Sequence, residues 1–209
     1  MSKEREELIH SLFLKFGSDK ADHLYHVPYS EYLPEHCSSL LEIGCFKGAS
    51  LRVWDRLYGT NCDIHTIDLF MDPANMSVRA CREAGFICHE GSQSNIKFLS
   101  TISKQFELII DDGSHKADDM IESFKHLFVN NMKSGGIYII EDLKCNEDIF
   151  WWGGLVKKFD DTPLAMFKNF ILNRKIENPY FNEGESQVFQ NLINRVKIWE
   201  DKIVFIWKN

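Results

Sequence analysis

The sequence predicts an α/β protein with a Rossmann-like sheet, mostly parallel with a terminal antiparallel hairpin. Short apolar runs of strand length alternate with segments of helical periodicity up to residue 142, an order typical of a doubly wound parallel sheet. Most of these runs end at an acidic residue, and such sheets bind ligands beyond the carboxyl ends of their strands. Two further apolar runs close the chain around a short turn, as in a β-hairpin.

Composition limits the classes of protein to consider. A chain of 209 residues that is 44% hydrophobic can bury the core of one domain. Its net charge of −7 argues against a nucleic-acid partner, and no run approaches the roughly 20 apolar residues of a membrane span. We expect no secretory signal, because the first residues are charged and the apolar run after them is short, and the six cysteines lack a C-x-x-C motif. We therefore expect reduced thiols in a cytoplasmic protein without membrane insertion, with a zinc site as the rival reading.

The N-terminal part of the chain combines a helix with a polar segment. Residues 4–16 carry apolar side chains at Leu8, Leu12 and Phe16, a spacing that predicts one buried helical face. Residues 17–29 are turn-prone and rich in hydrogen-bonding side chains. Two interpretations stay open for them: a surface connection, or a flap over a pocket.

A strand, a glycine turn and a helix follow in order. Residues 39–43 predict the strand, Gly44 and Gly48 bound the turn, and the helix runs through Leu57. This unit binds phosphates or nucleosides in α/β folds, because glycines let backbone amides approach a ligand closely. Glu42 adds an acid at the end of the strand.

The next strand is predicted over residues 63–68 and ends in Asp68, 24 residues after Gly44. An acid at this place hydrogen-bonds ribose hydroxyls in nucleoside-binding sheets, and a solvated strand end is the alternative. Residues 75–84 predict a helix and residues 85–90 a third strand.

The loop after the third strand carries short polar side chains. Ser92 or Gln93 could contact an adenine edge, and the alternative role for this loop is that Asn95 or Ser94 caps the next helix.

A fourth strand, residues 106–110, stops at two acids. Asp111 and Asp112 follow it directly, and His115 comes three residues later. A histidine here suits a general base, because its side chain takes up a proton near neutral pH. The alternative is a histidine that satisfies backbone groups at a helix entry.

A fifth strand, residues 137–140, also stops at two acids, Glu141 and Asp142. Because parallel strands end at one edge of a sheet, acids from both pairs should meet there. We expect them to hold a divalent cation, with solvated strand ends as the alternative. Six acids fall at predicted strand ends: Glu42, Asp68, Asp111, Asp112, Glu141 and Asp142.

The remaining elements complete the pattern. Residues 144–161 are irregular and contain Trp151-Trp-Gly-Gly154, which could form a substrate wall or pack under a loop. Helices are predicted over 117–128, 163–175 and 185–194, a turn at 134–136, and the closing strands over 196–200 and 203–207.

The chain resembles class I S-adenosylmethionine-dependent methyltransferases in its glycine turn, in Asp68 and in its closing hairpin. It also resembles a narrower group, the metal-dependent sugar O-methyltransferases of the mycinamicin type and their bacterial surface-polysaccharide relatives. The motifs that carry this narrower likeness are Gly17-Ser-Asp-Lys20, His23-x-Tyr25, Leu41-Glu-Ile-Gly44, Ile110-Asp-Asp-Gly-Ser-His115 and Gly135-Gly-Ile-Tyr-Ile-Ile-Glu-Asp142. Phe46 stands where many methyltransferases have a glycine.

The resemblance implies a methyl donor, a cation and a sugar acceptor. His115 would be the general base, and Mg²⁺ or another hard divalent cation would be bound by Asp112, Glu141 and Asp142. The acceptor would be a nucleotide sugar, a polysaccharide precursor or a glycosylated natural product. S-adenosylmethionine would be bound by Tyr25, Glu42, Gly44, Gly48, Asp68, Ser92, Gln93 and Asp111.

Three rival functions remain at this point. An iron-dependent hydroxylase would use two histidines and one carboxylate, whereas here one histidine accompanies the acids. A catechol-type O-methyltransferase would also use a metal and strand-end acids, and a nucleoside-binding protein would lack turnover. The aromatic residues after Trp151 would permit a homo-oligomer.

We expect one domain, 1–209, with parts 1–38 (helix and flap), 39–142 (donor and metal core), 143–184 (substrate region) and 185–209 (closing helix and hairpin).

Overall fold

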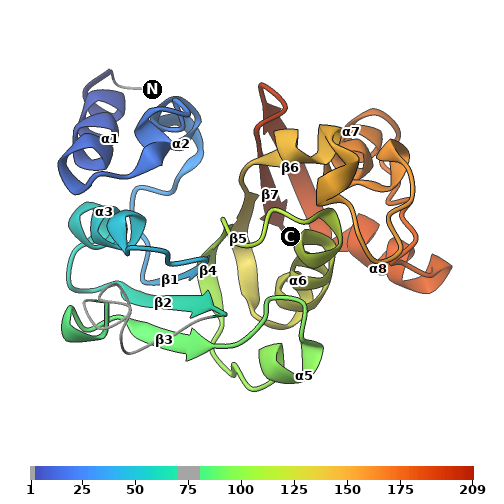
Figure 1. The fold of residues 1–209 in the computed structure, drawn as a ribbon, viewed down its shortest axis with the longest axis horizontal. Helices are drawn as coiled ribbons and strands as arrows, with labels where there is room; N and C mark the ends of the chain where they lie inside the picture. The colour runs from blue at the N-terminus through green and yellow to red at the C-terminus, as the bar shows by residue number, and fades with distance from the viewer. Residues whose placement is uncertain (1–2, 70–80) are drawn as a thin grey trace.

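A seven-stranded sheet forms the centre of the molecule in the computed structural model, which describes residues 3–69 and 81–209 (Figure 1). The strand order is β3-β2-β1-β4-β5-β7-β6. The first five strands in this order run parallel to one another, and β7 is antiparallel to both β5 and β6. The predicted fold class is confirmed. The strands are β1 (Ser39–Ile43), β2 (Asp63–Asp68), β3 (Ile87–Glu90), β4 (Phe106–Asp111), β5 (Met132–Ile140), β6 (Ile193–Trp199) and β7 (Ile203–Lys208).

Helices cover both faces of the sheet (Figure 1). On one face lie α1 (Lys3–Phe16), α2 (His26–Tyr32) and α3 (Ala49–Tyr58). On the other lie α5 (Ile96–Leu99), α6 (Ala117–Asn130), α7 (Pro163–Asn173) and α8 (Glu183–Leu192). Short 3₁₀ turns span Asp19–Ala21, Leu143–Glu147, Ile149–Trp151 and Phe159–Asp161. Most of the helix predicted over 75–84 lies outside the described residues.

The central strands read as continuous apolar runs because both of their faces are buried. Ile109 and Tyr138 pack into the core under α6 and α7, whereas Leu108 and Ile139 pack into the core under α1 and α3. All four side chains are inaccessible to solvent. Successive residues of a strand point to opposite faces, so each central strand contributes to two cores and aligns the carboxyl ends that carry the acids.

The segment between α1 and β1 is more than the surface connection that was one interpretation of residues 17–29, because several of its side chains are buried. Tyr25 and Tyr29 are 1% and 0% exposed. Tyr29 packs edge-on against Trp54 and Phe205, with ring centroids 5.3 and 5.9 Å apart. The polar composition of the segment was misleading, because Lys20, Tyr25 and Tyr29 are buried and hydrogen-bond to the strand-end acids.

Strand β5 begins five residues before its predicted start, at Met132. The predicted turn at Ser134–Gly136 is an irregularity inside this strand, where the pairing with β4 shifts register and Gly135 has a φ of 76°. The shift accommodates extra residues without ending the strand.

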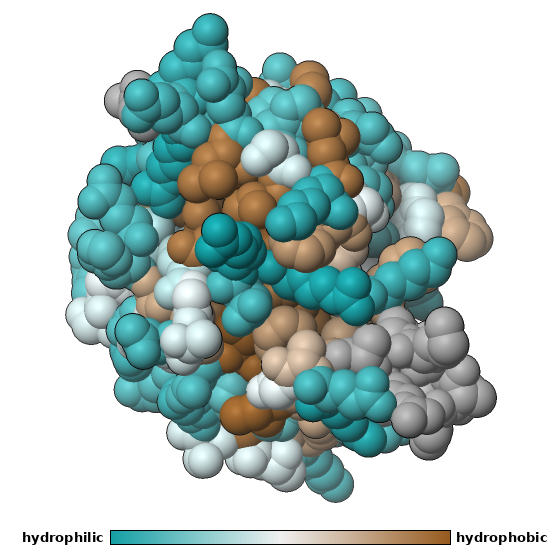
Figure 2. Space-filling model, turned by 90° about the vertical axis from the view of Figure 1, so that its left-hand side faces the viewer, coloured by the Kyte–Doolittle hydropathy of each residue, from teal (hydrophilic) through white to brown (hydrophobic). Residues whose placement is uncertain are grey.

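The face formed by α1 and α3 is not uniformly polar. Hydrophobic atoms reach the surface in the middle of this face (Figure 2), and Leu8 and Leu14 of α1 are exposed. None of the helices in the described ranges is long and apolar enough to cross a membrane. The six cysteines are free thiols.

Candidate active site

A cavity of about 490 Å³ lies beyond the carboxyl ends of β1, β2 and β4. Its volume falls in the range of small-molecule and cofactor sites, roughly 300–1,000 Å³. Gly17, Ser18, Asp19 and Lys20 also line it, so the segment after α1 forms part of its wall. Of the predicted site residues, the structure brings seven to this wall: Gly44, Asp68, Ser92, Gln93, Asp112, His115 and Asp142.

At one end of the cavity, the turn after β1 passes directly over the turn after β4. Gly44 has a φ of 88°, and a Cβ atom there would lie 2.2 Å from the carbonyl oxygen of Asp112. The Asp112 amide donates to the carbonyl of Ile43 at 3.0 Å, which fixes the crossing. Only glycine fits this close approach. Phe46, in the same turn, has a φ of 38° and is 78% exposed.

Asp68 joins the end of β2 to this glycine turn. Its Oδ2 accepts hydrogen bonds from the backbone amides of Cys45 at 2.9 Å and Phe46 at 3.3 Å. These two hydrogen bonds fix the shape of the turn, and Asp68 also lines the cavity. This is the place at which a ribose hydroxyl is bound in nucleoside-binding sheets.

Asp111 is fully buried, and hydrogen bonds to its carboxylate connect two loops of the cavity wall. The Gln93 Nε2 donates to both of its oxygens at 3.0 and 3.1 Å, and the Ser123 Oγ donates to Oδ2 at 2.6 Å. The Gln93 Oε1 in turn accepts from the Ser114 amide at 2.8 Å. Burial raises the pKa of Asp111 to about 6, against the effect of these hydrogen bonds. Asp111 itself lies behind the wall and not on it.

The other two predicted residues of the loop after β3 have local partners as well. The hydroxyl of Ser92, which lines the cavity, lies 3.0 Å from that of Ser94. Asn95 caps α5 by accepting a hydrogen bond from the amide of Phe98, which confirms the capping alternative for Asn95.

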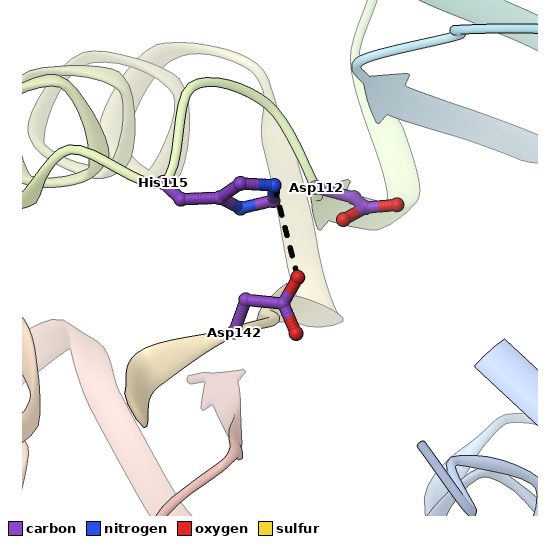
Figure 3. A group of neighbouring side chains, drawn as sticks. All are labelled: Asp112, His115 and Asp142. Atoms are coloured by element: carbon purple, nitrogen blue, oxygen red, sulfur yellow. Dashed lines mark ion pairs between the residues drawn. The ribbon is translucent and has the colours of Figure 1, made fainter. Parts of the chain in front are cut away.

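Asp112, His115 and Asp142, which also line the cavity and are called its cation end below, come together (Figure 3). One ligand atom from each lies within 4.8 Å of the others, a separation at which a single cation could be shared. His115 Nε2 faces Asp142 Oδ2 at 3.7 Å. His115 and Asp142 have φ values of 58° and 55°, a left-handed backbone that is uncommon outside glycine and that often marks functional sites.

Asp142 is held in place from the side of α2. The Tyr25 hydroxyl donates to Asp142 Oδ1 at 2.6 Å, and His23 Nδ1 lies 3.3 Å from the same oxygen. Burial, with Glu141 and Asp142 nearby, raises the pKa of Tyr25, so its hydroxyl stays a hydrogen-bond donor. The structure therefore puts Tyr25 beside the acids of the cation end, whereas it was predicted to bind the donor.

Lys20 is a buried residue of the cavity wall to which sequence reasoning gave no role. Its ammonium group is 2% exposed and lies 2.5 Å from Asp112 Oδ2, 2.6 Å from Glu141 Oε2 and 3.8 Å from Glu42 Oε1. Burial alone would lower the pKa of Lys20, but the three carboxylates outweigh it and raise the pKa well above its usual value. The available signal was its position in Gly17-Ser-Asp-Lys20, a motif of the resemblance to which no role was attached.

Glu141, predicted as a third metal ligand, is not brought into the group of Asp112, His115 and Asp142. It is 1% exposed; Oε2 accepts from Lys20 and Oε1 accepts from the hydroxyl of Tyr29. Both of its oxygens are therefore already engaged.

Glu42 and Gly48, predicted to bind the donor, also lie behind the cavity wall. Glu42 is fully buried and accepts a hydrogen bond from Ser50 Oγ at 2.8 Å, and burial raises its pKa to about 7 against the pull of Lys20. Gly48 begins α3, where a Cβ atom would lie 2.5 Å from Cys81 Sγ.

Several characterised enzymes are similar to this chain in sequence. One is the 8-demethyl-8-alpha-L-rhamnosyl tetracenomycin-C 2'-O-methyltransferase of Streptomyces olivaceus, 25% identical over 77% of this chain and 44% of that enzyme. Another is the mycinamicin VI 2''-O-methyltransferase of Micromonospora griseorubida, 32% identical over 59% of this chain and 30% of that enzyme. The chain thus spans less than half of the length of these relatives. No family model matches it.

Solved structures share the fold. The MycE methyltransferase of the mycinamycin pathway, in complex with Mg and SAH, superposes with a TM-score of 0.74 at 22% identity, over 96% of this chain and 54% of that one. The complex of the same enzyme that also contains mycinamycin VI gives 0.70. The predicted resemblance to class I methyltransferases, and within them to the mycinamicin type, is confirmed.

Proposed function

We propose that this chain is an S-adenosylmethionine-dependent O-methyltransferase that acts on a sugar hydroxyl. The observation that carries the proposal is one cavity whose wall contains Gly44 and Asp68 as well as the group Asp112, His115 and Asp142. Its relatives are named as sugar O-methyltransferases, which favours the same chemistry here. A nucleotide sugar, a polysaccharide precursor and a glycosylated natural product remain the candidate acceptors.

The donor would bind at the end formed by the glycine turn. Asp68 would accept hydrogen bonds from the ribose hydroxyls, while its Oδ2 also accepts from the amides of Cys45 and Phe46. Ser92 and Gln93, on the loop after β3, line the part of the wall where the adenine would lie. Bound in this way, the donor would share the cavity with the acids after β4 and β5, which would hold the acceptor.

The cation end fits a hard divalent ion. Asp112 and Asp142 offer carboxylate oxygens, which Mg²⁺ prefers, and Lys20 engages one of the two Asp112 oxygens. A bound cation would hold the acceptor hydroxyl and lower its pKa. Because nitrogen is a poor ligand for Mg²⁺, His115 is left for the proton.

The proposed reaction is balanced, and the residues named above take up the proton and hold the substrates. His115 accepts the hydroxyl proton while the oxygen attacks the donor methyl in line, and S-adenosylhomocysteine and a methyl ether leave. Asp142, held by Tyr25, keeps His115 oriented through their contact at 3.7 Å. Holding the reactants in one geometry supplies much of the acceleration.

A methyl-transfer screen tests this function. We expect transfer to one class of glycoside or nucleotide sugar in the presence of Mg²⁺, its loss with a chelator, and its recovery when Mg²⁺ is added back. The readout is the mass of the methylated product. Transfer that persists in excess chelator would exclude the cation, and donor binding without transfer to any acceptor would support a nucleoside-binding protein instead.

One observation favours a second function, a catechol-type O-methyltransferase. The Trp151 ring lies beside His115, with centroids 6.2 Å apart, and a flat phenol could pack against it. The same screen separates the two, because this alternative predicts methylated catechols and unchanged sugars. Cytoplasmic location, homo-oligomer formation and the lack of a nucleic-acid partner remain predictions.

Replacing Asp68 with alanine should raise the dissociation constant of the donor at least tenfold. The change removes the ribose acceptor and also releases the amides of Cys45 and Phe46, so the turn loses its shape. Calorimetric titration with S-adenosylhomocysteine measures this dissociation constant. Asp63→Ala is the matched control, since this exposed acid of the same strand pairs with Lys104 on the surface. Unchanged affinity in Asp68→Ala would show that the ribose contact is misassigned.

A further inference from the structure

Gln93 lines the cavity, but its side-chain amide is already engaged inside the protein. The side chain is 6% exposed, and Nε2 donates to both oxygens of Asp111 at 3.0 and 3.1 Å and to Ser123 Oγ at 3.3 Å. Its Oε1 accepts from the Ser114 amide at 2.8 Å. Gln93 therefore has no donor left for the edge of a bound base, and recognition of that edge falls to a neighbouring side chain of the wall.

Asp119 offers such a side chain. It lies in the first turn of α6 and, like Ser114, lines the cavity. The Ser114 hydroxyl donates to Asp119 Oδ2 at 2.8 Å and accepts from the Lys116 amide at 3.2 Å, so the carboxylate is held in one orientation. No hydrogen bond to Asp119 Oδ1 forms within the described residues 3–69 and 81–209. One oxygen of a fixed carboxylate is thus available to a ligand in the cavity.

The chemistry of this oxygen limits the ligand groups that suit it. An ionised carboxylate accepts hydrogen bonds and cannot donate them, so it selects a group that donates. Adenine carries one exocyclic donor, its 6-amino group, whereas its ring nitrogens accept. The hydrogen bond between Gln93 and Ser114 joins Asp119 to the loop after β3, beside which the adenine would lie. A hydrogen bond from the amino group to Asp119 would be charge-assisted and therefore strong.

We propose, resting on the function proposed above, that Asp119 binds the 6-amino group of the donor's adenine and makes the site selective for adenine over hypoxanthine. In hypoxanthine a carbonyl oxygen replaces the amino group, so two acceptors would face each other and neither would have a partner. Ser114 is a positioning residue in this scheme, because its hydroxyl holds the carboxylate that contacts the base.

The test compares S-adenosylhomocysteine with S-inosylhomocysteine, in which hypoxanthine replaces adenine. For the wild-type protein, we expect calorimetric titration to give a dissociation constant about tenfold higher, or more, for the inosyl compound. In Asp119→Asn the side-chain amide can donate as well as accept, so the two dissociation constants should come within about threefold of each other. Asp118→Asn is the matched control: Asp118 lies in the same helical turn but outside the cavity wall, and its loss should keep the wild-type ratio.

Two results would overturn this role of Asp119 and leave the proposed function intact. One is an unchanged ratio in Asp119→Asn, and the other is a wild-type protein that binds both compounds equally well. A wild-type protein that binds neither compound would overturn the proposed function as well.

Asp119→Ala keeps the proposal testable if Asp119→Asn does not fold, since alanine favours a helix. It should weaken binding of the adenosyl compound about tenfold and change binding of the inosyl compound by less than about threefold. Equal weakening of both compounds would show that the residue only supports the wall, and would overturn the proposal.

Discussion

Gly44→Ala should destabilise the protein by about 3 kcal/mol and abolish binding at both ends of the cavity. Part of the cost is the left-handed backbone, since Gly44 has a φ of 88°. The larger part is the new methyl group, which would lie 2.2 Å from the Asp112 carbonyl oxygen and force the turn after β4 to move. Because that turn carries Asp112 and leads to His115, donor and Mg²⁺ affinity should fall together.

Gly85→Ala is the matched control, because it isolates the backbone term. Gly85 has nearly the same φ, 87°, but an added Cβ atom there would meet nothing within 4 Å among the residues that the structure describes. We expect it to cost about 1 kcal/mol and to leave ligand affinity unchanged. Urea unfolding and titration with S-adenosylhomocysteine compare the two variants. Equal losses would show that the crossing of the two turns does not constrain the site.

The fold could be predicted because its signals are local. Strands β1, β2 and β4 each appear in the sequence as an apolar run that stops at an acid, and both faces of these strands are buried. The segment before β1 was harder, since α2 is short and its buried Tyr25 and Tyr29 stand among polar residues. Tertiary contacts with Trp54 and Phe205 decide its structure, and no local pattern encodes them.

The candidate site was predicted in part for the same reason. Asp112 and Asp142 could be placed together because neighbouring parallel strands end at one edge. Lys20 could not be placed, since its partners Asp112 and Glu141 are 92 and 121 residues away in sequence. Lys20 also pairs with Glu141, and the positions of the strand-end acids in the sequence do not predict this pair.

His115→Ala should lower turnover by about 10²- to 10⁴-fold while the donor still binds. The side chain is 27% exposed and faces Asp142, whereas the proposed donor contacts come from Asp68 and the glycine turn, so its removal leaves those contacts in place. Single-turnover kinetics with saturating donor measure the effect. His36→Ala, an exposed histidine outside the cavity wall, is the control and should retain full turnover.

His115→Asn separates the loss of the base from a change in the backbone. His115 has a φ of 58°, which alanine adopts at a cost, whereas asparagine tolerates this region well. If His115 accepts the proton, asparagine keeps the turn in shape but loses turnover as alanine does. If the residue mainly holds the turn, asparagine should keep turnover close to wild type. That second result would assign the proton to another group, and the base in the proposed reaction would have to be replaced.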